Sequence, residues 1–412
     1  MVTLWAFLSQ VLSEDGSCRE AVSRVIAYCA GHNQKTPSPR TGAYCKARQR
    51  LPEGLLERLL DHSATDLEGQ ARPEDLWHGK QIRVVDGTGI SMPDTPENQK
   101  EYPQPSSQAP GCGFPILRLI VFFSLVTGAL LARAMGPLGD SEMVLFRQLL
   151  DHLAPNDLLL GDRYYGNFWV VAALQQRGAD VLLRVAASRR SDFRRGQRLG
   201  KDDHLIVWKK PSTCPSYLTP EAYAALPQEL LLREIRGTIY AKGFKSRSVV
   251  LITTLLDPKD YSRQELLELY ARRWHCELRL RDVKIGLHMD VLRTQTPKMV
   301  RKELLAKLLA YNLIRRLMWE AGVRSGARPL RLSFKGAVQH VRMFAPILAA
   351  LAPPARQALH DLLLKTLAAE SVPERPGRIE PRLKKRRPKS FGWLQKPRAL
   401  CRRLLRLGRK LK

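Results

Sequence analysis

The sequence predicts an α/β protein in which a central sheet lies between helices. Between residues 81 and 185, short apolar runs alternate with segments of helical periodicity. Two long amphipathic segments follow at residues 262–285 and 298–321. Hydrophobic residues make up 44 % of the 412-residue chain, so it can build a substantial core and is not globally disordered.

Residues 1–75 are predicted to form a helical N-terminal region. Cys18–Tyr28 has apolar residues at helical spacing, and residues 41–50 and 55–62 suggest two further helices. We interpret this basic region as DNA-contacting, although a helical cap on the core fits the pattern equally well. Met1 leads almost directly into a helix without the features of a signal peptide, and this abrupt start suggests a longer natural N-terminus.

Residues 76–187 are predicted to form the first part of the core. Gln81–Asp86 reads as a strand, and Ile116–Met135 reads as two strands joined at a tight turn rather than as a membrane span. A helix starting at Asp140 or Ser141, the strand Asp157–Asp162, a helix near residues 167–177 and a strand near 181–185 follow. This order predicts a ribonuclease H-like core with a mixed sheet.

The remaining chain divides into three predicted parts. Residues 188–256 contain short β-prone runs among prolines, glycines and charges, which indicate a β-rich insertion. Residues 257–325 form the last part of the core, and Ser262 is predicted to cap a long helix that reaches Ile285. Residues 326–412 form a helical C-terminal region that ends in a basic tail.

The charge of the chain points to a polyanionic partner. Sixty-eight Lys and Arg residues oppose 39 acids, which gives a net charge of +29. Residues 371–412 alone hold 16 basic and 2 acidic residues. Such an excess favours nucleic acid, because neutralised phosphates release counterions. Seven scattered cysteines without a Cys-x-x-Cys pair argue against a structural zinc site and suggest a reducing, cytoplasmic environment.

Asp86 and Asp162 each follow an apolar run and are predicted to end two strands, which can be neighbours in a mixed sheet. Either aspartate alone would usually be a turn or capping residue. Together, at the rim of a mixed sheet, they are candidates for a metal site. Hydrolysis of a phosphodiester can use two divalent ions about 4 Å apart, and Mg²⁺ is held by a few carboxylates, waters and the substrate phosphate.

The third candidate acid lies in a more specific pattern. Tyr270, Arg273, Glu277 and Lys284 are spaced at offsets of 0, 3, 7 and 14. At about 100° per residue these positions share one face of a continuous helix. The acid could complete a metal site while the cations grip phosphates. A solvated amphipathic helix with ion pairs would give a similar pattern.

The three motifs together resemble the DDE transposases of the IS4 family of bacterial insertion sequences. The resemblance rests on Val-Val-Asp-Gly-Thr at residues 84–88, Gly-Asp-Arg-Tyr-Tyr-Gly at 161–166 and Tyr-x2-Arg-x3-Glu-x6-Lys from residue 270. The resemblance implies two Mg²⁺ or Mn²⁺ ions as cofactors. It also implies a homodimer that binds double-stranded DNA at the terminal inverted repeats and moves the element into target DNA by cut-and-paste transfer. Such a protein would act in the bacterial cytoplasm, in association with the nucleoid. By position the resemblance makes Asp86, Asp162 and Glu277 metal ligands, and Tyr270, Arg273 and Lys284 contacts to the DNA backbone.

Two features stand apart from this pattern. Some family members stack a flipped base on a tryptophan before the strand that leads to the glutamate helix, but residues 245–250 contain no aromatic residue. Trp208 is a weak substitute, and we expect it to lie in the core. The remaining nearby acids are interpreted as structural, namely Asp94, Asp140, Glu142 and Asp157.

The sequence therefore predicts a metal-dependent transposase. Two alternatives stay open at this point: a ribonuclease H-like nuclease or resolvase that cuts without joining, and a catalytically inactive DNA-binding derivative.

Overall fold

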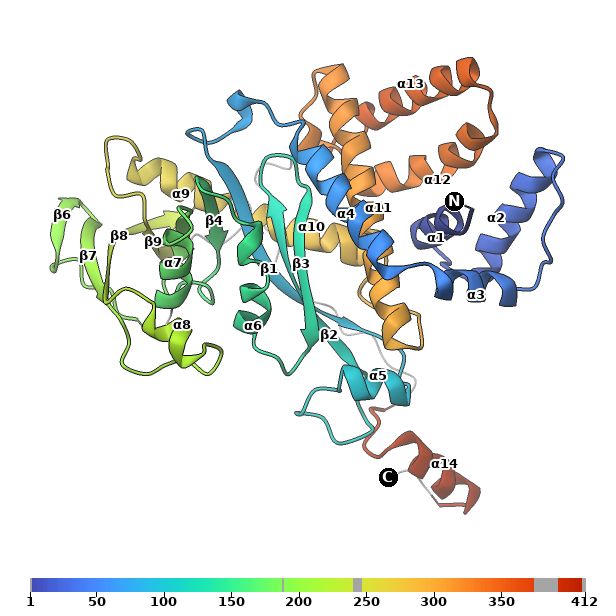
Figure 1. Ribbon diagram of the computed structural model, residues 1–412, viewed down its shortest axis with the longest axis horizontal. Helices are drawn as coiled ribbons and strands as arrows, with labels where there is room; N and C mark the ends of the chain where they lie inside the picture. Colours follow the sequence, from blue (N-terminus) through green and yellow to red (C-terminus); the bar gives the residue numbers. More distant parts are fainter. Residues whose placement is uncertain (1, 187–188, 240–246, 374–391, 410–412) are drawn as a thin grey trace.

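The computed structural model describes residues 2–186, 189–239, 247–373 and 392–409. Its centre is a sheet of nine strands in the order β3-β2-β1-β4-β5-β9-β8-β7-β6, with helices on both faces (Figure 1). The strands are β1 Gln81–Ser91, β2 Ile116–Ser124, β3 Leu130–Pro137, β4 Asp157–Gly161, β5 Asp180–Arg184, β6 Gln197–Gly200, β7 Asp203–Lys209, β8 Glu229–Ile239 and β9 Arg247–Thr253.

The first five strands form the predicted ribonuclease H-like arrangement. β1, β2 and β3 form an antiparallel meander, whereas β1, β4 and β5 run parallel to one another. The apolar segment 116–135 is the β2–β3 hairpin, and Gly128 in its turn has a φ of 78° that favours glycine. No helix in the described residues is long and apolar enough to cross a membrane.

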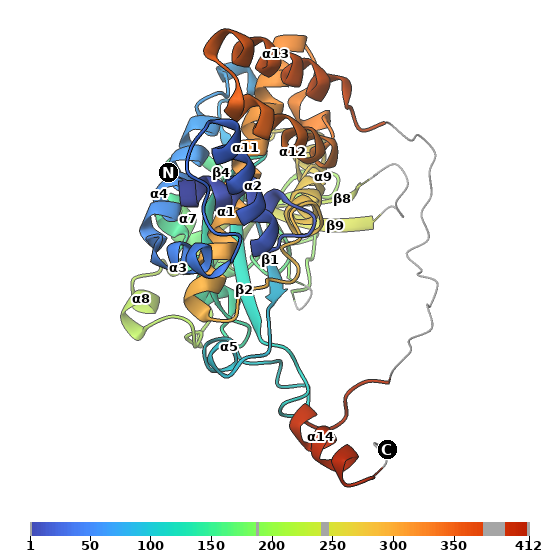
Figure 2. The same ribbon diagram turned by 90° about the vertical axis from the view of Figure 1, so that its right-hand side faces the viewer.

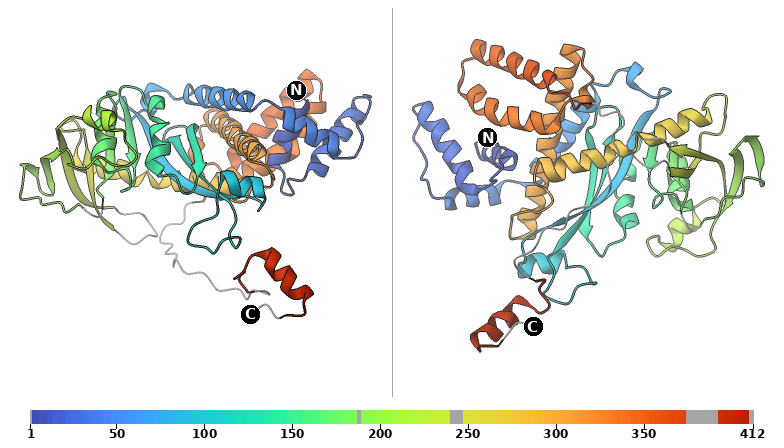
Figure 3. Two further views of the ribbon diagram at one scale, coloured as in Figure 1. Left: turned by 60° about the horizontal axis from the view of Figure 1, so that its bottom comes forward. Right: turned by 180° about the vertical axis from the view of Figure 1, so that it is seen from behind.

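Successive side chains along the strands point to opposite faces of the sheet, and each face has its own apolar core. Ile82 and Val84 belong to the core under the long C-terminal helices, whereas the neighbouring Val85 belongs to the core on the other face. That second face carries α6 (Glu142–Arg147) and α7 (Phe168–Gln175). Figure 3 shows the segment with α9 (Arg263–Ala271) and α10 (Trp274–Arg281) crossing the opposite face of the sheet.

The β-rich segment after β5 continues the same sheet. β9 pairs with β5 and with β8, so β6, β7 and β8 extend the core sheet outward. Arg233 on β8 is fully buried and bonds both carboxylate oxygens of Asp203 on β7, at 2.6 and 2.8 Å. Trp208 is 1 % exposed and lies in the second core, as expected. Residues 245 and 246 lie outside the described residues.

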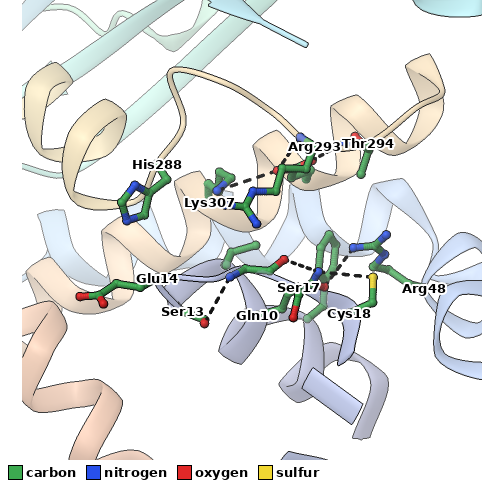
Figure 4. A pocket seen from close by; sticks show the side chains of 14 residues that line it. Gln10, Ser13, Glu14, Ser17, Cys18, Arg48, His288, Arg293, Thr294 and Lys307 are labelled. Atoms are coloured by element: carbon green, nitrogen blue, oxygen red, sulfur yellow. Dashed lines mark hydrogen bonds and ion pairs between the residues drawn. The ribbon is translucent and has the colours of Figure 1, made fainter. Parts of the chain in front are cut away.

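Helices from the N-terminal and C-terminal regions of the chain pack together beside this sheet. α4 packs along α11, and α1 also contacts α11. A cavity lies between Gln10, Ser17 and Cys18 on the N-terminal side and Arg293, Thr294 and Lys307 (Figure 4). In Figure 2, α14 projects away from the main body. The remaining helices are α1 Val2–Leu12, α2 Cys18–Gly31, α3 Gly42–Arg50, α4 Glu53–Glu68, α5 Pro96–Glu101, α8 Pro220–Ala224, α11 Pro297–Ser325, α12 Phe334–Ala350, α13 Pro353–Ala369 and α14 Arg398–Arg406.

Two expected elements differ from the structure. β1 does not end at Asp86, because its pairing with β2 continues to Ser91. The helix that starts after Ser262 is not continuous to Ile285. It tightens at Arg272–Arg273, whose amides bond carbonyls three residues back, and then widens into a π-helical turn at Asp282–Gly286.

Candidate active site

Asp86 and Asp162 lie at equivalent points of two neighbouring parallel strands. Val84 of β1 pairs with Leu160 of β4, and each aspartate follows two residues later. Val84 and Leu160 belong to the core on the α10 side of the sheet, so strand alternation places both aspartates on that side. β4 ends at Gly161, which leaves Asp86 at the point where β1 loses its parallel partner.

The α9–α10 segment crosses both strands at this point. The Tyr270 hydroxyl donates a hydrogen bond to the Gly161 carbonyl at the end of β4, at 3.2 Å. Farther along the chain, the Lys284 ammonium donates to the Thr88 hydroxyl at 2.9 Å and to the Gly89 carbonyl at 3.2 Å, both on β1. Glu277 lies between these two anchor points, in the first turn of α10.

The charges of Asp162 and Glu277 both act on Asp86. Burial is the main cause that raises the pKa of Asp86 to about 6, and these two charges contribute to the rise, whereas the Gly87 amide and Arg273 oppose it. Arg273 also donates a hydrogen bond of 3.1 Å to the Glu277 carboxylate. The candidate site thus concentrates three carboxylates and one guanidinium in a half-buried space, where negative charge is costly without a cation.

The residues of the predicted stripe occupy different environments. Tyr270 is 5 % exposed, and burial raises the pKa of its hydroxyl to about 12. It therefore stays neutral and supports the end of β4 rather than facing solvent. Arg273 and Lys284 are partly exposed at the edge of the site. The interrupted helix still crosses β1 and β4, because Tyr270 bonds the end of β4 and the π-turn carries Lys284 onto β1.

From the sequence, Glu142 is interpreted as a structural residue at the start of a helix. α6 does begin at Glu142, and the Ser141 hydroxyl accepts a hydrogen bond from the Met143 amide. The Glu142 carboxylate also lies 3.5 Å from the point where a Cβ on Gly87 would stand, directly beside Asp86. Nothing in the local sequence distinguishes this glutamate from an ordinary first-turn acid, since the proximity arises from packing of α6 on β2 and β3.

The oxygen ligands at this site suit a hard divalent cation. Among the described residues, no three His, Cys, Asp or Glu side chains already form a cage for a metal ion. Mg²⁺ does not require one, because it is commonly held by one or two carboxylates with waters and substrate phosphates completing its shell. A cation beside Asp86 would also offset the burial and the neighbouring negative charges that raise the pKa of this carboxyl.

Comparison with known proteins agrees with this geometry. The family model described as "Transposase DDE domain" matches residues 77–313, which include both strand aspartates and the glutamate helix. The chain belongs to the DDE transposase family. This DDE transposase is 26 % identical over 388 residues to the transposase InsG for insertion sequence element IS4 of Escherichia coli (strain K12), covering 93 % of this chain and 85 % of that protein. The predicted IS4-family resemblance is confirmed.

Two further similarities were found for this DDE transposase. The putative transposase InsL for insertion sequence element IS186A of Escherichia coli (strain K12) is 27 % identical over 280 residues, covering 61 % of this chain and 70 % of that protein. A solved piggyBac transposase synaptic complex with hairpin DNA aligns at a TM-score of 0.40 and 9 % identity, over 69 % of this chain and 57 % of that one. Family membership makes the protein an enzyme of DNA transposition whose chemistry depends on a divalent metal.

Proposed function

We propose that this transposase cuts and joins DNA at a two-metal site held by Asp86, Asp162 and Glu277, with Mg²⁺ or Mn²⁺ as the ions. The observation that carries the proposal is the equivalent placement of the two aspartates on parallel strands, with the glutamate helix crossing over them. The raised pKa of Asp86 supports it, because the site buries this carboxylate close to the charges of Asp162 and Glu277, and a bound cation would compensate for both effects.

The chain supplies positioning and charge. Divalent ions, when bound, activate a water or 3′-hydroxyl nucleophile and stabilise the leaving oxygen. Asp86 and Asp162 are held by rigid strands, and the Gly87 amide fixes one oxygen of Asp86 at 2.9 Å. Glu277 would exchange its ion pair with Arg273 for a metal, which frees the guanidinium for a phosphate of the DNA backbone.

The DNA backbone contacts are proposed to come from Arg273 and Lys284, at the two sides of Glu277. Lys284 lies against β1 beyond Asp86, so its ammonium stands at the edge of the acidic space. For Tyr270, burial and the bond to Gly161 favour support of Asp162 through the end of β4 over direct contact with DNA.

The wider DNA-binding surface is proposed to include residues 1–75 and the basic tail. The loop after α2 and helix α3 present exposed cations at Lys35, Arg40, Lys46 and Arg50. Such cations suit a sequence-independent grip on phosphates. We further propose that the protein acts as a homodimer that bridges the two terminal inverted repeats of its element, on DNA of the bacterial nucleoid.

A strand-transfer assay tests the proposed site. The purified full-length protein is incubated with the element's own flanking repeats, a target plasmid and Mg²⁺ or Mn²⁺. Wild type should give joined products, and Glu277→Gln should abolish them because a neutral amide binds a divalent cation weakly. Glu268→Gln is the matched control, since Glu268 lies exposed on α9 away from the strand aspartates.

Each other outcome contradicts a stated part of the proposal. Cleavage without joining by wild type would indicate the nuclease or resolvase alternative. DNA binding without metal-dependent cleavage would indicate an inactive derivative. Full activity of Glu277→Gln would refute the assignment of the third acid.

A further inference from the structure

Glu142 approaches the two aspartates from the opposite face of the sheet. It lies on the same face of α6 as Phe146, four residues later, and the Phe146 ring packs on the Tyr165 ring at 5.2 Å between centroids. The Ser141 hydroxyl lies 3.4 Å from the Tyr164 hydroxyl, so the start of α6 rests on the turn that follows Asp162. Glu142 is thereby held beside both acidic strand positions.

Two glycines lie next to the aspartates, and neighbouring side chains fill the space at both. Gly87 follows Asp86, and a Cβ there would meet Ile120 at 2.7 Å and the Glu142 carboxylate at 3.5 Å. Gly161 precedes Asp162, and a Cβ there would meet Leu183 at 2.9 Å, and Tyr165 and Val85 at 3.1 Å. The Glu142 carboxylate and the Cβ of Tyr165 therefore pack close to the backbone beside the two aspartates.

The Tyr165 hydroxyl is unsatisfied in this arrangement. The residue is 1 % exposed, and within the described part of the chain its hydroxyl oxygen has no hydrogen-bond partner. Burial raises its pKa, and the carboxylates of Glu142, Asp86 and Asp162 are the next contributors, so the hydroxyl lies within electrostatic reach of all three. A buried hydroxyl without a partner destabilises a protein by about 1–3 kcal/mol, and a group that hydrogen-bonds to it would remove this cost.

The Glu142 carboxylate is similarly available. Burial raises the pKa of Glu142, the charge of Arg118 lowers it, and the charge of Asp162 raises it. Arg118 itself donates to the Asp140 carbonyl at 2.5 Å. Among the described residues, no hydrogen bond or ion pair occupies the Glu142 oxygens, so they are free to accept hydrogen bonds from water or another donor.

We propose that Glu142 and the Tyr165 hydroxyl are positioning residues of the active centre: together they hydrogen-bond the hydrated divalent cation held by Asp86 and Asp162. This inference rests on the proposed metal site and adds a second layer to it. Glu142 contributes a negative charge and an acceptor, and Tyr165 contributes a hydroxyl that can donate to a carboxylate or accept from water. These two residues would reach the cation past the end of β4, which stops at Gly161 beside Asp162.

Mn²⁺ binding to the full-length protein tests the inference without relying on catalysis. Free Mn²⁺ is measured by electron paramagnetic resonance during titration of wild type, Glu142→Gln, Tyr165→Phe and Asp86→Asn. We expect Glu142→Gln and Tyr165→Phe each to weaken binding by about ten-fold or more, the usual effect of losing an outer partner of a metal ligand. Glu221→Gln is the matched control, because Glu221 is an exposed first-turn glutamate of the short helix α8.

Unfolding of the same variants separates positioning from simple structural support. Without metal, Tyr165→Phe should be as resistant to urea as wild type or more so, since the hydroxyl has no partner. A purely structural hydroxyl would give the reverse pattern, with lower metal-free stability and unchanged Mn²⁺ affinity. That pattern, or unchanged Mn²⁺ affinity in Glu142→Gln, would overturn the inference about Glu142 and Tyr165 but leave the proposed metal site intact. Mn²⁺ binding that does not depend on Asp86 would instead refute the proposed metal site.

Discussion

Replacing Asp86 with asparagine should stabilise the metal-free protein. Burial, together with the neighbouring Asp162 and Glu277 charges, raises the pKa of Asp86 from 3.8 to about 6. At about 1.4 kcal/mol for each pH unit, keeping this carboxylate ionised in the fold costs about 3 kcal/mol near pH 8. Asparagine removes the charge but keeps an oxygen that can accept the 2.9 Å hydrogen bond from the Gly87 amide.

The pH dependence has a definite sign. Below pH 3.8 the carboxyl is protonated in both the folded and unfolded states, so ionisation of Asp86 costs nothing. Between 3.8 and about 6 the unfolded state ionises first, and the stability of the wild type falls as pH rises. The advantage of Asp86→Asn should therefore be small near pH 4 and grow to about 2–3 kcal/mol near pH 8.

Urea unfolding followed by tryptophan fluorescence, in the presence of a chelator, measures this difference. Asp157→Asn is a control on the neighbouring strand: Asp157 is buried with an ion pair to Arg83 at 3.3 Å, so its neutralisation should destabilise by about 1–3 kcal/mol. Adding Mn²⁺ should reduce the advantage of Asp86→Asn, because only wild type gains from the cation. A gain that is equal near pH 4 and pH 8, or a loss near pH 8, would refute the electrostatic reasoning.

Three further substitutions test other parts of the structure. Tyr270→Phe removes the buried bond to Gly161 and should lower the free energy of unfolding by about 1 kcal/mol while leaving DNA affinity unchanged in a gel-shift titration. Lys284→Met should weaken DNA binding, and the slope of log affinity against log salt should fall by about 1, as for one lost phosphate contact; an unchanged slope would exclude this contact. Arg233→Met leaves buried Asp203 without its partner and should lower the free energy of unfolding by about 3–5 kcal/mol. Calorimetry should show the β6–β8 extension and the β1–β5 core melting in one transition, since β8 and β5 belong to one sheet. Separate melting of the extension and the core would contradict that coupling.

Much of the chemistry was readable in the sequence. The apolar runs before Asp86 and Asp162 specified strands, and the spacing of Tyr270, Arg273, Glu277 and Lys284 marked one side of a helical segment. Side-chain periodicity and charge are local properties, so they can be recognised in the amino-acid sequence alone. The predicted strand order of the core also agrees with the sheet, because short connections limit the arrangements available to such a chain.

Tertiary packing decided where the elements around the candidate site end and which of their side chains are buried, and sequence periodicity does not contain this information. The strand containing Asp86 continues to Ser91 because β2 remains beside it, and the helix around Glu277 breaks and widens so that Lys284 reaches β1. Whether a tyrosine faces solvent or the core depends on neighbours distant in sequence, and so Tyr270 is buried.

The sequence by itself determined the three acidic motifs, the basic charge and the family. Only the tertiary structure decided that Glu142 lies beside Gly87 and that Tyr165 is buried beside Gly161, because these environments arise where segments distant in sequence pack together. The two glycines lie on neighbouring strands only when β1 and β4 pair, and neither strand contains this arrangement alone.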